Sequence, residues 1–496
     1  MKNKEDKVKV KERAVKEKDQ KGLTASKESN FSEWFSEVIQ KAELCDLRYN
    51  VKGFVVFQPW SVLSMEKMYS YMEKALQKKG HKPYYFPTVI PESNLKKESD
   101  HILGFTPEVF WVTGAGNDKF EEKLALRPTS ETAFYQMFSL WIRSYKDLPF
   151  KTYQRANVFR YETKATRPFL RSREFHWIEA HCAHASEEDA MKQVYEDMET
   201  TKEVLHDIFG LPFIFFERPS WDKFPGAHRT FAADVLNPDG RVVQQPSTHL
   251  LKQDFAKAFD VKFKNNDGKD KYVWITCYGP AISRIFASVT IVHGDDKGLR
   301  FPWEIASLHV AIVPIADDEK IIKKAKDVKK ELDNFCSVDI DLRDKSAGEK
   351  FNEWEMKGVP IRIDIGLKDI EGKKLTVFRR DLNKKEQINE KDLMSYVKNV
   401  SLESSKNLIK QADSLFNNRI KDAKNKEEVK KVIGEGKIAR CNFCSIESDG
   451  EKCAEIIEKE IGADVRGTRL EKEKTSGKCA ICDKTANEVV YIARSY

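Results

Sequence analysis

Arginine and glutamate side chains crowd together in one short stretch, FRYETKATRPFLRSREF at residues 159–175. Its charged residues beyond one lysine are Arg160, Glu162, Arg167, Arg171, Arg173 and Glu174. The planar guanidinium group suits phosphate and carboxylate oxygens, and a carboxylate accepts hydrogen bonds from an amine. With aromatic rings at both ends, the stretch favours ligands that together carry a phosphate, a flat base and an ammonium group, as ATP and an amino acid do. The alternative is a ladder of surface ion pairs.

Alternation along this stretch predicts a β-hairpin. In the order Phe-Arg-Tyr-Glu, Arg160 and Glu162 fall on one face of a strand, because side chains alternate with a period of two. The loop TKATRPFL leads into RSREFHWIEAH, where the same count places on one face Arg171, Arg173, Phe175, Trp177 and Glu179. The hairpin would bring these two rows of charged and aromatic side chains together.

Two further stretches offer groups for the same ligands. KLALRPTSETAFY, residues 123–135, places a hydroxyl and a carboxylate two residues apart, at Thr129 and Glu131. YGPAISRIFASVTIVHGDDKG, residues 278–298, is a turn followed by an apolar helix with Arg284 near its start, so a cation and helix-start amides could receive an anion. Each signal is weak alone, since a Gly-Pro turn before a helix is common.

The elements that must hold these groups indicate an α+β fold. Apolar spacing predicts a helix at 31–44, then a longer amphipathic helix whose apolar stripe is Met65, Met68, Tyr69, Met72 and Leu76. An aromatic strand ending at Pro87 follows, and the pair could form a core or a dimer interface. Short strands bounded by proline and glycine recur to about residue 305, which is typical of an antiparallel sheet flanked by helices.

The pattern then changes and predicts four parts. Strand and helix signals alternate after residue 308 and indicate a small α/β domain. The predicted parts are a charged arm at 1–30, an α+β domain at 31–305, an α/β domain at 306–404 and a C-terminal domain at 405–496. The Lys/Glu-rich arm is expected to be a disordered tail, with a weak attraction for RNA as the alternative.

The composition is that of a folded protein with locally basic faces. The chain has 496 residues, 40% of them apolar, and its net charge of +7 allows nucleic acid as a partner without requiring it. No apolar run could span a bilayer, and the N-terminal residues lack the apolar core of a signal peptide. Nine cysteines in so long a chain do not suggest a disulfide scaffold, so a cytoplasmic location is expected.

Paired cysteines late in the chain predict a structural zinc site. CNFC at 441–444 and CAIC at 479–482 are two Cys-x-x-Cys pairs, from which tetrahedral Cys₄ sites are built. Cys453 is a fifth candidate, and spacing alone favours Cys441 with Cys444. The remaining cysteines fit core positions better than a metal site; they are Cys45, Cys182, Cys277 and Cys336.

Together these stretches closely resemble the class II aminoacyl-tRNA synthetases, and among them the prolyl-tRNA synthetases of the archaeal and eukaryotic type. The resemblance runs from about Phe31 to Tyr496, with motif 1 ending at Pro87, motif 2 from FRYE to RSREF and motif 3 around Arg284. RPTSET, HCAH, WDKFPGA and HGDDKGL are further similarities. The resemblance implies ATP- and Mg²⁺-dependent attachment of L-proline to tRNA(Pro) by a homodimer, through prolyl-adenylate with release of pyrophosphate.

The resemblance also implies that residues 31–305 are the catalytic domain, 306–404 the anticodon-binding domain and 405–496 the zinc-containing domain, and it implies roles for individual residues. Arg160 would contact the α-phosphate and the proline carboxylate, and Arg284 the γ-phosphate. The other residues expected on ATP are Glu162, Arg171, Ser172, Phe175, Gln244 and Ser247. The proline pocket would also contain Thr129, Glu131, Trp177, Glu179 and His249. The zinc ligands would be Cys444, Cys453, Cys479 and Cys482, with Cys441 as the alternate. The anticodon would meet Arg343, Arg379 and Arg380, unless these are merely exposed basic residues.

The chain departs from the family pattern at several positions. Ser247 stands where threonine is usual, Lys252 replaces a glycine, GPAISR has one residue more than usual between its glycine and Arg284, and GLRFPWEIA carries Trp-Glu where Pro-Pro or Pro-Arg is typical. An RNA-binding protein that has lost charging activity is therefore one alternative. Threonyl specificity is another, although that enzyme lacks WDKFPGA and would hold a catalytic-domain zinc through a cysteine and two histidines.

Two further expectations concern an editing domain and the C-terminal residue. The gap from His181 to Gly279 leaves no room for the editing domain of bacterial relatives, so hydrolysis of alanyl-tRNA is not expected. The carboxylate of Tyr496 is expected to reach the catalytic domain, with a frayed end as the alternative.

Overall fold

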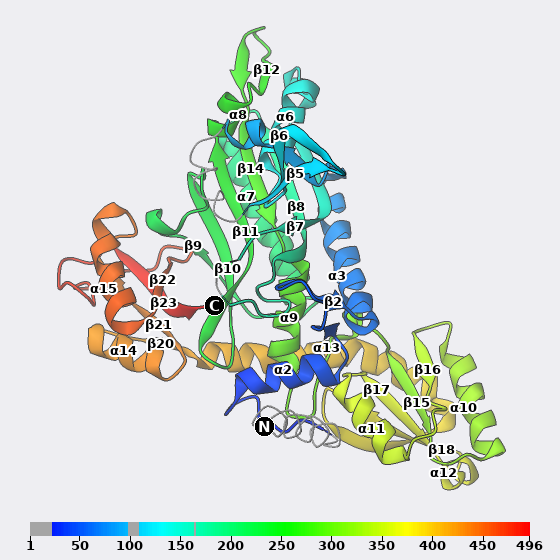
Figure 1. Cartoon of the computed structure of the whole chain (residues 1–496). Coiled ribbons are helices and arrows are strands. Elements are labelled where there is room, and N and C mark those ends of the chain that lie inside the picture. The colour runs from blue at the N-terminus through cyan, green and yellow to red at the C-terminus, as the bar shows by residue number, and fades with distance from the viewer. Residues whose placement is uncertain (1–21, 98–108, 163–164) are drawn as a thin grey trace, which may run out of the picture. The chain divides into compact units, whose positions relative to one another are not determined.

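The computed structural model describes residues 22–97, 109–162 and 165–496 (Figure 1). Most of the predicted charged arm, residues 1–21, lies outside the described residues. The rest of it is held in place, because Lys27 Nζ donates to the carbonyl of Gly294 at 2.6 Å and the amide of Thr24 donates to Glu37 at 2.7 Å. The packed chain therefore begins before residue 30. Among the described helices, none combines the length and the apolar character needed to cross a membrane.

The chain divides into two compact units, and each is built from distant parts of the sequence. The first contains residues up to 46, 57–64 and 289–410; the second contains 47–56, 65–288 and 411–496. Two of these divisions lie at 288/289 and 410/411, whereas the predicted boundaries lie at 305 and 404. A boundary between the catalytic and C-terminal parts is not found, because both belong to the second unit.

The first unit contains the predicted small α/β domain. Its sheet has the order β16-β15-β17-β18-β19, in which β15 runs parallel to both neighbours and the last three strands are antiparallel. The strands are β15 (Val310–Pro314), β16 (Val338–Ile340), β17 (Ile361–Ile365), β18 (Lys374–Arg379) and β19 (Lys384–Asn389). The helices of this unit are α2 (Phe31–Lys41), α10 (Glu319–Leu332), α11 (Ala347–Met356), α12 (Leu367–Glu371) and most of α13 (Leu393–Asn418).

Helix α10 illustrates how the sequence specifies these elements. The Asp318 carboxylate accepts the amide hydrogens of Lys320 at 2.8 Å and Ile321 at 3.2 Å, which caps the start of the helix. Its buried stripe is Ile321, Ala325, Val328 and Leu332, at helical spacing. This stripe packs against the apolar strands in one core.

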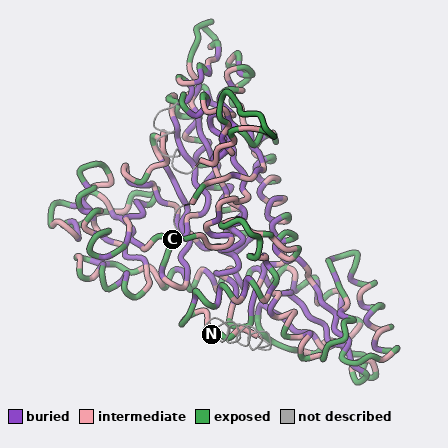
Figure 2. The backbone as a smooth tube through the Cα atoms, viewed as in Figure 1, coloured by how far each residue is buried: buried purple, intermediate pink, exposed green. Residues whose placement is uncertain are grey.

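The second unit is organised around a sheet of 11 described strands, which follows the order β20-β21-β23-β11-β14-β8-β7-β3, with β10 on β11, β9 on β10 and β22 on β23. The strands within the predicted catalytic domain are β3 (Lys82–Pro83), β7 (Phe150–Phe159), β8 (Glu174–His184), β9 (Ile214–Glu217), β10 (Arg229–Leu236), β11 (Arg241–Lys252) and β14 (Trp274–Gly279). The pairs among β7, β8, β14, β11, β10 and β9 are all antiparallel. This confirms the predicted fold class. Figure 2 shows that β8, β11 and β14 are buried along most of their length.

Helices and two small sheets complete this unit. The helices are α3 (Pro59–Lys78), whose first turns belong to the other unit, α4 (Glu92–Leu95), α6 (Glu131–Trp141), α7 (Glu187–Thr201), α8 (Asp254–Ala258), α9 (Ile282–His293), which ends in the other unit, α14 (Lys426–Gly434) and α15 (Glu451–Ile461). The small sheets join β4 (Val89–Pro91), β5 (Phe110–Ala115) and β6 (Asp118–Leu126), and β12 (Lys262–Lys264) with β13 (Asp270–Tyr272).

The C-terminal strands extend the catalytic sheet. They are β20 (Ile420–Asp422), β21 (Ile438–Phe443), β22 (Asp464–Gly467) and β23 (Glu488–Ser495). Strand β23 runs parallel to β11, where Arg494 pairs with Arg241 and Ser495 with Val242. The last residues of the sequence are therefore held beside a central strand of the catalytic sheet.

The predicted hairpin exists, but its strands end earlier than predicted, before the charged residues of the connecting loop. Strands β7 and β8 pair from Phe150↔Ala183 to Phe159↔Glu174. Arg160 and Glu162 follow β7, and Arg171 precedes β8, so the prediction that these charged residues lie within the paired strands is wrong. The chain leaves the ladder because the amide of Glu162 turns back onto the carbonyl of Arg160 at 2.8 Å.

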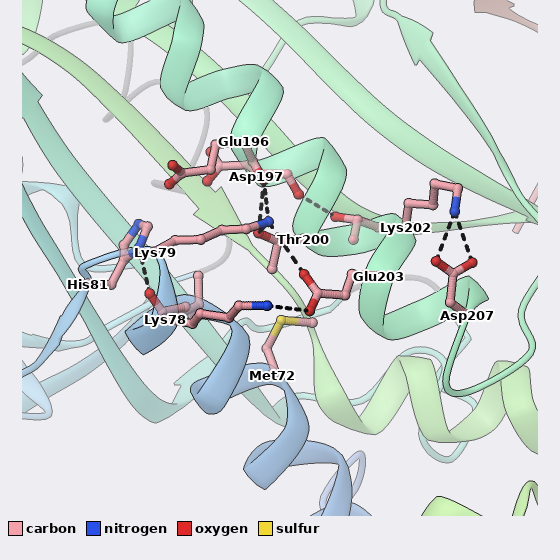
Figure 3. Close-up of polar contacts among 12 residues, drawn as sticks. Met72, Lys78, Lys79, His81, Glu196, Asp197, Thr200, Lys202, Glu203 and Asp207 are labelled. Carbon is pink, nitrogen blue, oxygen red and sulfur yellow. Dashed lines mark hydrogen bonds and ion pairs between the residues drawn. The ribbon is translucent and has the colours of Figure 1, made fainter.

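Charged side chains join the end of α3 to the end of α7 (Figure 3). Lys79 Nζ donates to Thr200 Oγ1 at 2.8 Å and lies 3.7 Å from Glu203, and Lys78 lies 3.9 Å from the same carboxylate. On the same helix α7, Asp197 is buried and accepts hydrogen bonds from Thr248 at 2.7 Å and Gln193 Nε2 at 2.8 Å. These contacts fix α7 on the face of the sheet.

Asp197 makes the stability of this unit depend on pH. Burial raises the pKa of its carboxyl from 3.8 to about 7, despite the two donors. The folded protein therefore keeps a proton that the unfolded chain loses between pH 4 and 7, so stability falls as pH rises through this window, by at most about 4 kcal/mol.

We expect Asp197→Asn to lack this loss of stability, so that its melting temperature relative to wild type rises from pH 5 to pH 8. Asp267→Asn, in an exposed turn, is the control; a pH-independent difference for the Asp197 variant would contradict the explanation.

Candidate active site

Three arginines meet at a cavity of about 120 Å³ beside the hairpin. Arg160 and Arg171 come from the connection between β7 and β8, and Arg284 comes from the first turn of α9. The rest of the lining is Glu162, Phe169, Leu170, Ser172, Phe175, Ala281 and Ser283. Six residues predicted to bind ATP thus line one cavity, although the predicted strand geometry that suggested this was wrong.

Backbone carbonyls and aromatic rings orient the arginines. Arg160 Nε donates to the carbonyl of Pro128 at 3.1 Å, and its guanidinium lies 5.4 Å from the ring centre of Phe175. Arg284 donates to the carbonyls of Leu170 at 3.3 Å and Gln244 at 3.2 Å. These bonds fix the arginine positions before any ligand arrives.

The crowding of cations has an electrostatic cost that an anion would relieve. Burial and then the neighbouring guanidiniums of Arg160 and Arg171 lower the pKa of Arg284 from 12.5 to about 10, and Glu162 only partly compensates. Arg284 remains charged at neutral pH. Ser172 Oγ is buried in the same lining and has no hydrogen-bond partner among the described residues. A cavity with mutually repelling guanidiniums and an unused hydroxyl is suited to a polyphosphate ligand.

An adjoining cavity of about 230 Å³ shares Leu170, Arg171 and Arg284 with the first. Gln244 and Tyr496 also line it. The main-chain oxygen of Tyr496 accepts a hydrogen bond from Arg171, and its hydroxyl accepts one from Arg167. The last residue therefore lies at the cavity, as expected, and Arg167 holds it there.

Arg173 braces the hairpin. Its amide donates to the carbonyl of Gly53 at 2.9 Å and its guanidinium lies 4.0 Å from the ring centre of Tyr161. Gly53 has φ +84°, and a Cβ there would lie 2.7 Å from Arg173 Cδ, so this close approach requires glycine.

A second group of predicted residues lies deeper, around the start of α6. Thr129 Oγ1 donates to the Glu131 carboxylate, and both residues are buried. Glu179 accepts hydrogen bonds from Ser130 Oγ and Gln154 Nε2, each at 2.5 Å. Glu179 therefore fixes the turn that presents Thr129 and Glu131, rather than standing free for a ligand.

His249 and Trp177 lie beside this group. Thr230 and Ser247 contact the two ring nitrogens of His249 at 3.0 and 2.9 Å, and burial lowers the pKa of His249 to about 4, so the ring is neutral. Ser247, predicted on ATP, is thus used by His249 and lines neither cavity. The buried indole N–H of Trp177 has no hydrogen-bond partner among the described residues.

The sequence departures have local explanations. Lys252 has φ +52° at an irregularity in the β11–β14 register, which is the conformation that favours the usual glycine. The longer GPAISR turn still delivers Arg284 to the cavity. Trp303 stacks on His309 with ring centres 4.4 Å apart and Glu304 accepts from Ser405, so the Trp-Glu pair serves the first unit internally.

Two residues near Glu131 were not predicted as site residues. The ligand atoms of Glu131, His181 and Cys277 all lie within 4.8 Å of one another, and Tyr135 Oη lies 2.9 Å from His181 Nδ1. Cys277 was expected only in the core, where it is indeed buried. Its strand neighbours, Thr276 and Tyr278, carry no signal of a site, and only its closeness to GPAISR could have suggested one.

Four cysteines of the C-terminal part converge. The sulfur atoms of Cys444, Cys453, Cys479 and Cys482 lie within 4.8 Å of one another, and those of the first two are 3.7 Å apart. Thiolates bound to one tetrahedral zinc at about 2.3 Å would be separated by about 3.8 Å, so the arrangement fits zinc. Cys441 is buried on β21 but does not belong to this group.

The three arginines predicted at the anticodon differ in exposure. Arg379 pairs with Asp381 at 2.9 Å and Arg380 with Asp295 at 2.5 Å, and both arginines are buried. These guanidiniums hold the first unit together, which corrects the expectation that they face RNA. Arg343 pairs with Asp341 but keeps 46% of its side chain exposed.

Comparisons with known proteins match these three regions in order. Residues 110–293 match the model of the tRNA synthetase class II core domain (G, H, P, S and T), 309–400 an anticodon binding domain, and 426–496 the C-terminal domain of prolyl-tRNA synthetase. The chain is 48% identical to the proline–tRNA ligase of Thermofilum pendens, over 96% of this chain and 100% of the relative. It is 43% identical to that of Methanopyrus kandleri, over 94% and 96%.

Solved structures show the same similarity. The prolyl-tRNA synthetase of Giardia lamblia in complex with prolyl-adenylate superposes with a TM-score of 0.93 at 37% identity, covering 96% of this chain and 100% of the other. The enzyme of Cryptosporidium parvum, complexed with halofuginone and AMPPNP, has a TM-score of 0.91 at 32% identity, with 96% and 99% covered.

Proposed function

The chain belongs to the proline–tRNA ligase family, the prolyl-tRNA synthetases of class II, and we propose that Arg160, Arg171 and Arg284 form the catalytic centre of its reaction. The enzyme attaches L-proline to tRNA(Pro) in two steps. Proline and ATP give prolyl-adenylate and pyrophosphate, and the prolyl group then passes to the terminal ribose of the tRNA. The observation that carries the assignment of residues is the cavity where three guanidiniums meet. Burial there, and then the neighbouring Arg160 and Arg171, lower the pKa of Arg284.

The arginines supply what this chemistry requires. A proline carboxylate is already ionised at neutral pH, so its attack on the α-phosphate needs no general base. Arg160 holds the carboxylate and the α-phosphate together, and Arg284 takes the γ-phosphate that leaves in pyrophosphate. Preorganised charge and positioning then lower the barrier. Ser172, Phe175 and Gln244 surround the rest of the nucleotide, while Ser247 acts through His249.

The buried group at the start of α6 is the proline pocket in this proposal. Thr129 and Glu131 accept the hydrogens of the proline ammonium, and Trp177 and neutral His249 enclose the ring. Glu179 acts indirectly, because its carboxylate already accepts two short hydrogen bonds from Ser130 and Gln154.

We propose two metal sites, one for Mg²⁺ and one for Zn²⁺. Glu162 lines the first cavity and Asp222 the adjoining one, and these carboxylates would hold the Mg²⁺ that neutralises phosphate charge. Zn²⁺ would be held by Cys444, Cys453, Cys479 and Cys482, and its function is structural. A four-cysteine zinc site needs reduced cysteines, so we propose a reducing, cytoplasmic location.

A second copy of the chain is the proposed partner of an aromatic patch in the second unit. Tyr84 stacks on Trp141 with ring centres 5.3 Å apart, while Tyr85 is 84% exposed and Leu140 53% exposed. Large apolar side chains grouped in this way are typical of interfaces. Sedimentation of the wild type as a dimer, and of Tyr85→Glu/Leu140→Glu as a monomer, is the expected result; a monomeric wild type would contradict it.

tRNA(Pro) is the macromolecular substrate, and the first unit is its proposed anticodon-binding part. Of the three arginines considered, only the half-exposed Arg343 is kept as a candidate contact. Such contacts with RNA weaken as salt is added.

Tyr496 links the C-terminal strand to the nucleotide cavity, so its removal tests the geometry of that cavity. We expect deletion of Tyr496 to raise the KM for ATP about 10-fold, because Arg171 and Arg167 lose the partner that orients them. The KM for proline should change less, since Tyr496 does not touch the group around Glu131. Steady-state kinetics with each substrate varied measures both, and equal KM values for ATP in the two proteins would contradict the role.

A further inference from the structure

Glu131, His181 and Cys277 form a compact set of metal-binding groups inside the catalytic part. They come from the start of α6, the middle of β8 and the middle of β14, and each is at most 6% exposed. Their ligand atoms lie within 4.8 Å of one another. Carboxylate, imidazole and thiolate are the three ligand types of zinc sites, and three protein ligands with one open position is the arrangement of zinc sites that also bind a small molecule.

The surroundings favour this use of His181. Tyr135 Oη lies 2.9 Å from its Nδ1, while its Nε2 faces the Glu179 carboxylate at 3.4 Å. A histidine that binds a metal through one nitrogen normally has the other held by such a partner. Glu179 thereby places a further carboxylate beside the same three groups.

We propose that the proline pocket also binds a Zn²⁺-type cation on Glu131, His181 and Cys277, and that this cation excludes proline. The Cys277 thiol binds as a thiolate, and its proton passes to solvent. A single thiolate distinguishes this site from the four-cysteine site, so its cation is held more weakly and is removable by mild chelation. The soft sulfur ligand favours Zn²⁺ over Mg²⁺.

Exclusion of proline follows from the shared carboxylate, and this step rests on the proposed role of Glu131. A cation on Glu131 occupies the oxygen atoms that the proline ammonium needs, and two positive groups cannot share it at short distance. Free zinc would therefore inhibit amino-acid activation in competition with proline. The ATP cavity, lined by other residues, would keep its affinity.

Cobalt reports on the site without relying on catalysis. Full-length protein whose C-terminal cysteines are loaded with zinc is titrated with Co²⁺ and followed by absorption. We expect one further equivalent with a sulfur-to-cobalt charge-transfer band. Cys277→Ser should lose that band, Glu131→Gln should weaken binding at least about 10-fold, and Cys336→Ser, a buried cysteine of the first unit, should leave both unchanged. Binding of no further cobalt, or a band that survives Cys277→Ser, would overturn the proposal.

Proline supplies a test that needs no variant. Saturating L-proline should displace the added cobalt, and Zn²⁺ should raise the apparent KM for proline in pyrophosphate exchange without changing that for ATP. Cobalt that stays bound at saturating proline would overturn the exclusion. Failure of the proposed catalytic roles would instead appear as unimpaired exchange in the metal-free Arg160 variant, so the two failures are distinguishable.

Discussion

Arg160→Ala should lower proline-dependent ATP–pyrophosphate exchange by about 10³-fold, which is the scale of losing a charged group that stabilises a phosphoryl-transfer transition state. Arg160 is held by the carbonyl of Pro128 and by the ring of Phe175, so its position exists before substrate binds. It lines the cavity proposed for ATP and donates to Pro128, the residue before Thr129 of the proposed proline pocket, so in the proposed reaction it contacts both reacting groups. We expect the loss mainly in kcat, measured by exchange at saturating substrates.

Arg160→Lys should also be strongly impaired, because a point charge cannot reproduce a planar fork that contacts two oxygens. Arg143→Ala provides the matched control: Arg143 is an exposed arginine of the same unit, outside both cavities. If Arg160→Ala kept more than a tenth of the wild-type rate, Arg160 would not be the residue that joins the two substrates.

Loss of the C-terminal zinc is the second large effect that we expect. Binding of zinc to four cysteines contributes on the order of 10 kcal/mol to folding, and the residues around this site share one small core. Cys479→Ser should leave the protein without tightly held zinc and should make residues 426–496 sensitive to protease. Activity should fall as well, because β23 carries Tyr496 to the nucleotide cavity.

Cys441→Ser distinguishes a metal ligand from a buried thiol. Cys441 lies in the same core, is buried, and does not belong to the group of four. We expect this variant to keep one zinc per chain by elemental analysis, whereas Cys479→Ser keeps none. Loss of zinc in both variants, or in neither, would contradict the choice of ligands.

Much of this arrangement follows from local sequence patterns. The strands that bear the site, the helix at Arg284 and the α/β domain were predictable, because alternation, apolar stripes and turn residues are local signals. The sequence predicted that Arg160, Glu162 and Arg171 lie at one site, and they do line one cavity, but the predicted strand alternation is not the cause. Their grouping arises from a turn closed by the Glu162 amide and from the packing of the connection, not from alternation along a strand.

The remainder depends on contacts between distant segments. Cys277 has no local feature that separates it from a core cysteine, and only folding brings it to Glu131 and His181. Arg380 looked like an exposed basic residue on a strand, yet Asp295, 85 residues earlier, pairs with it. The extension of the catalytic sheet by β23 likewise could not be predicted, because a sequence does not state which strands become neighbours.

Amino-acid-dependent ATP–pyrophosphate exchange by the wild-type protein tests the central claim most directly. Proline, threonine and alanine would each be supplied with ATP and Mg²⁺, without tRNA. A pocket built around Thr129 and Glu131 predicts strong exchange with proline and none with threonine. Exchange with alanine should be much weaker than with proline but measurable, because the two methylene groups that alanine lacks contribute about 2–6 kcal/mol to binding. Exchange with threonine instead of proline, or with none of the three, would contradict the account.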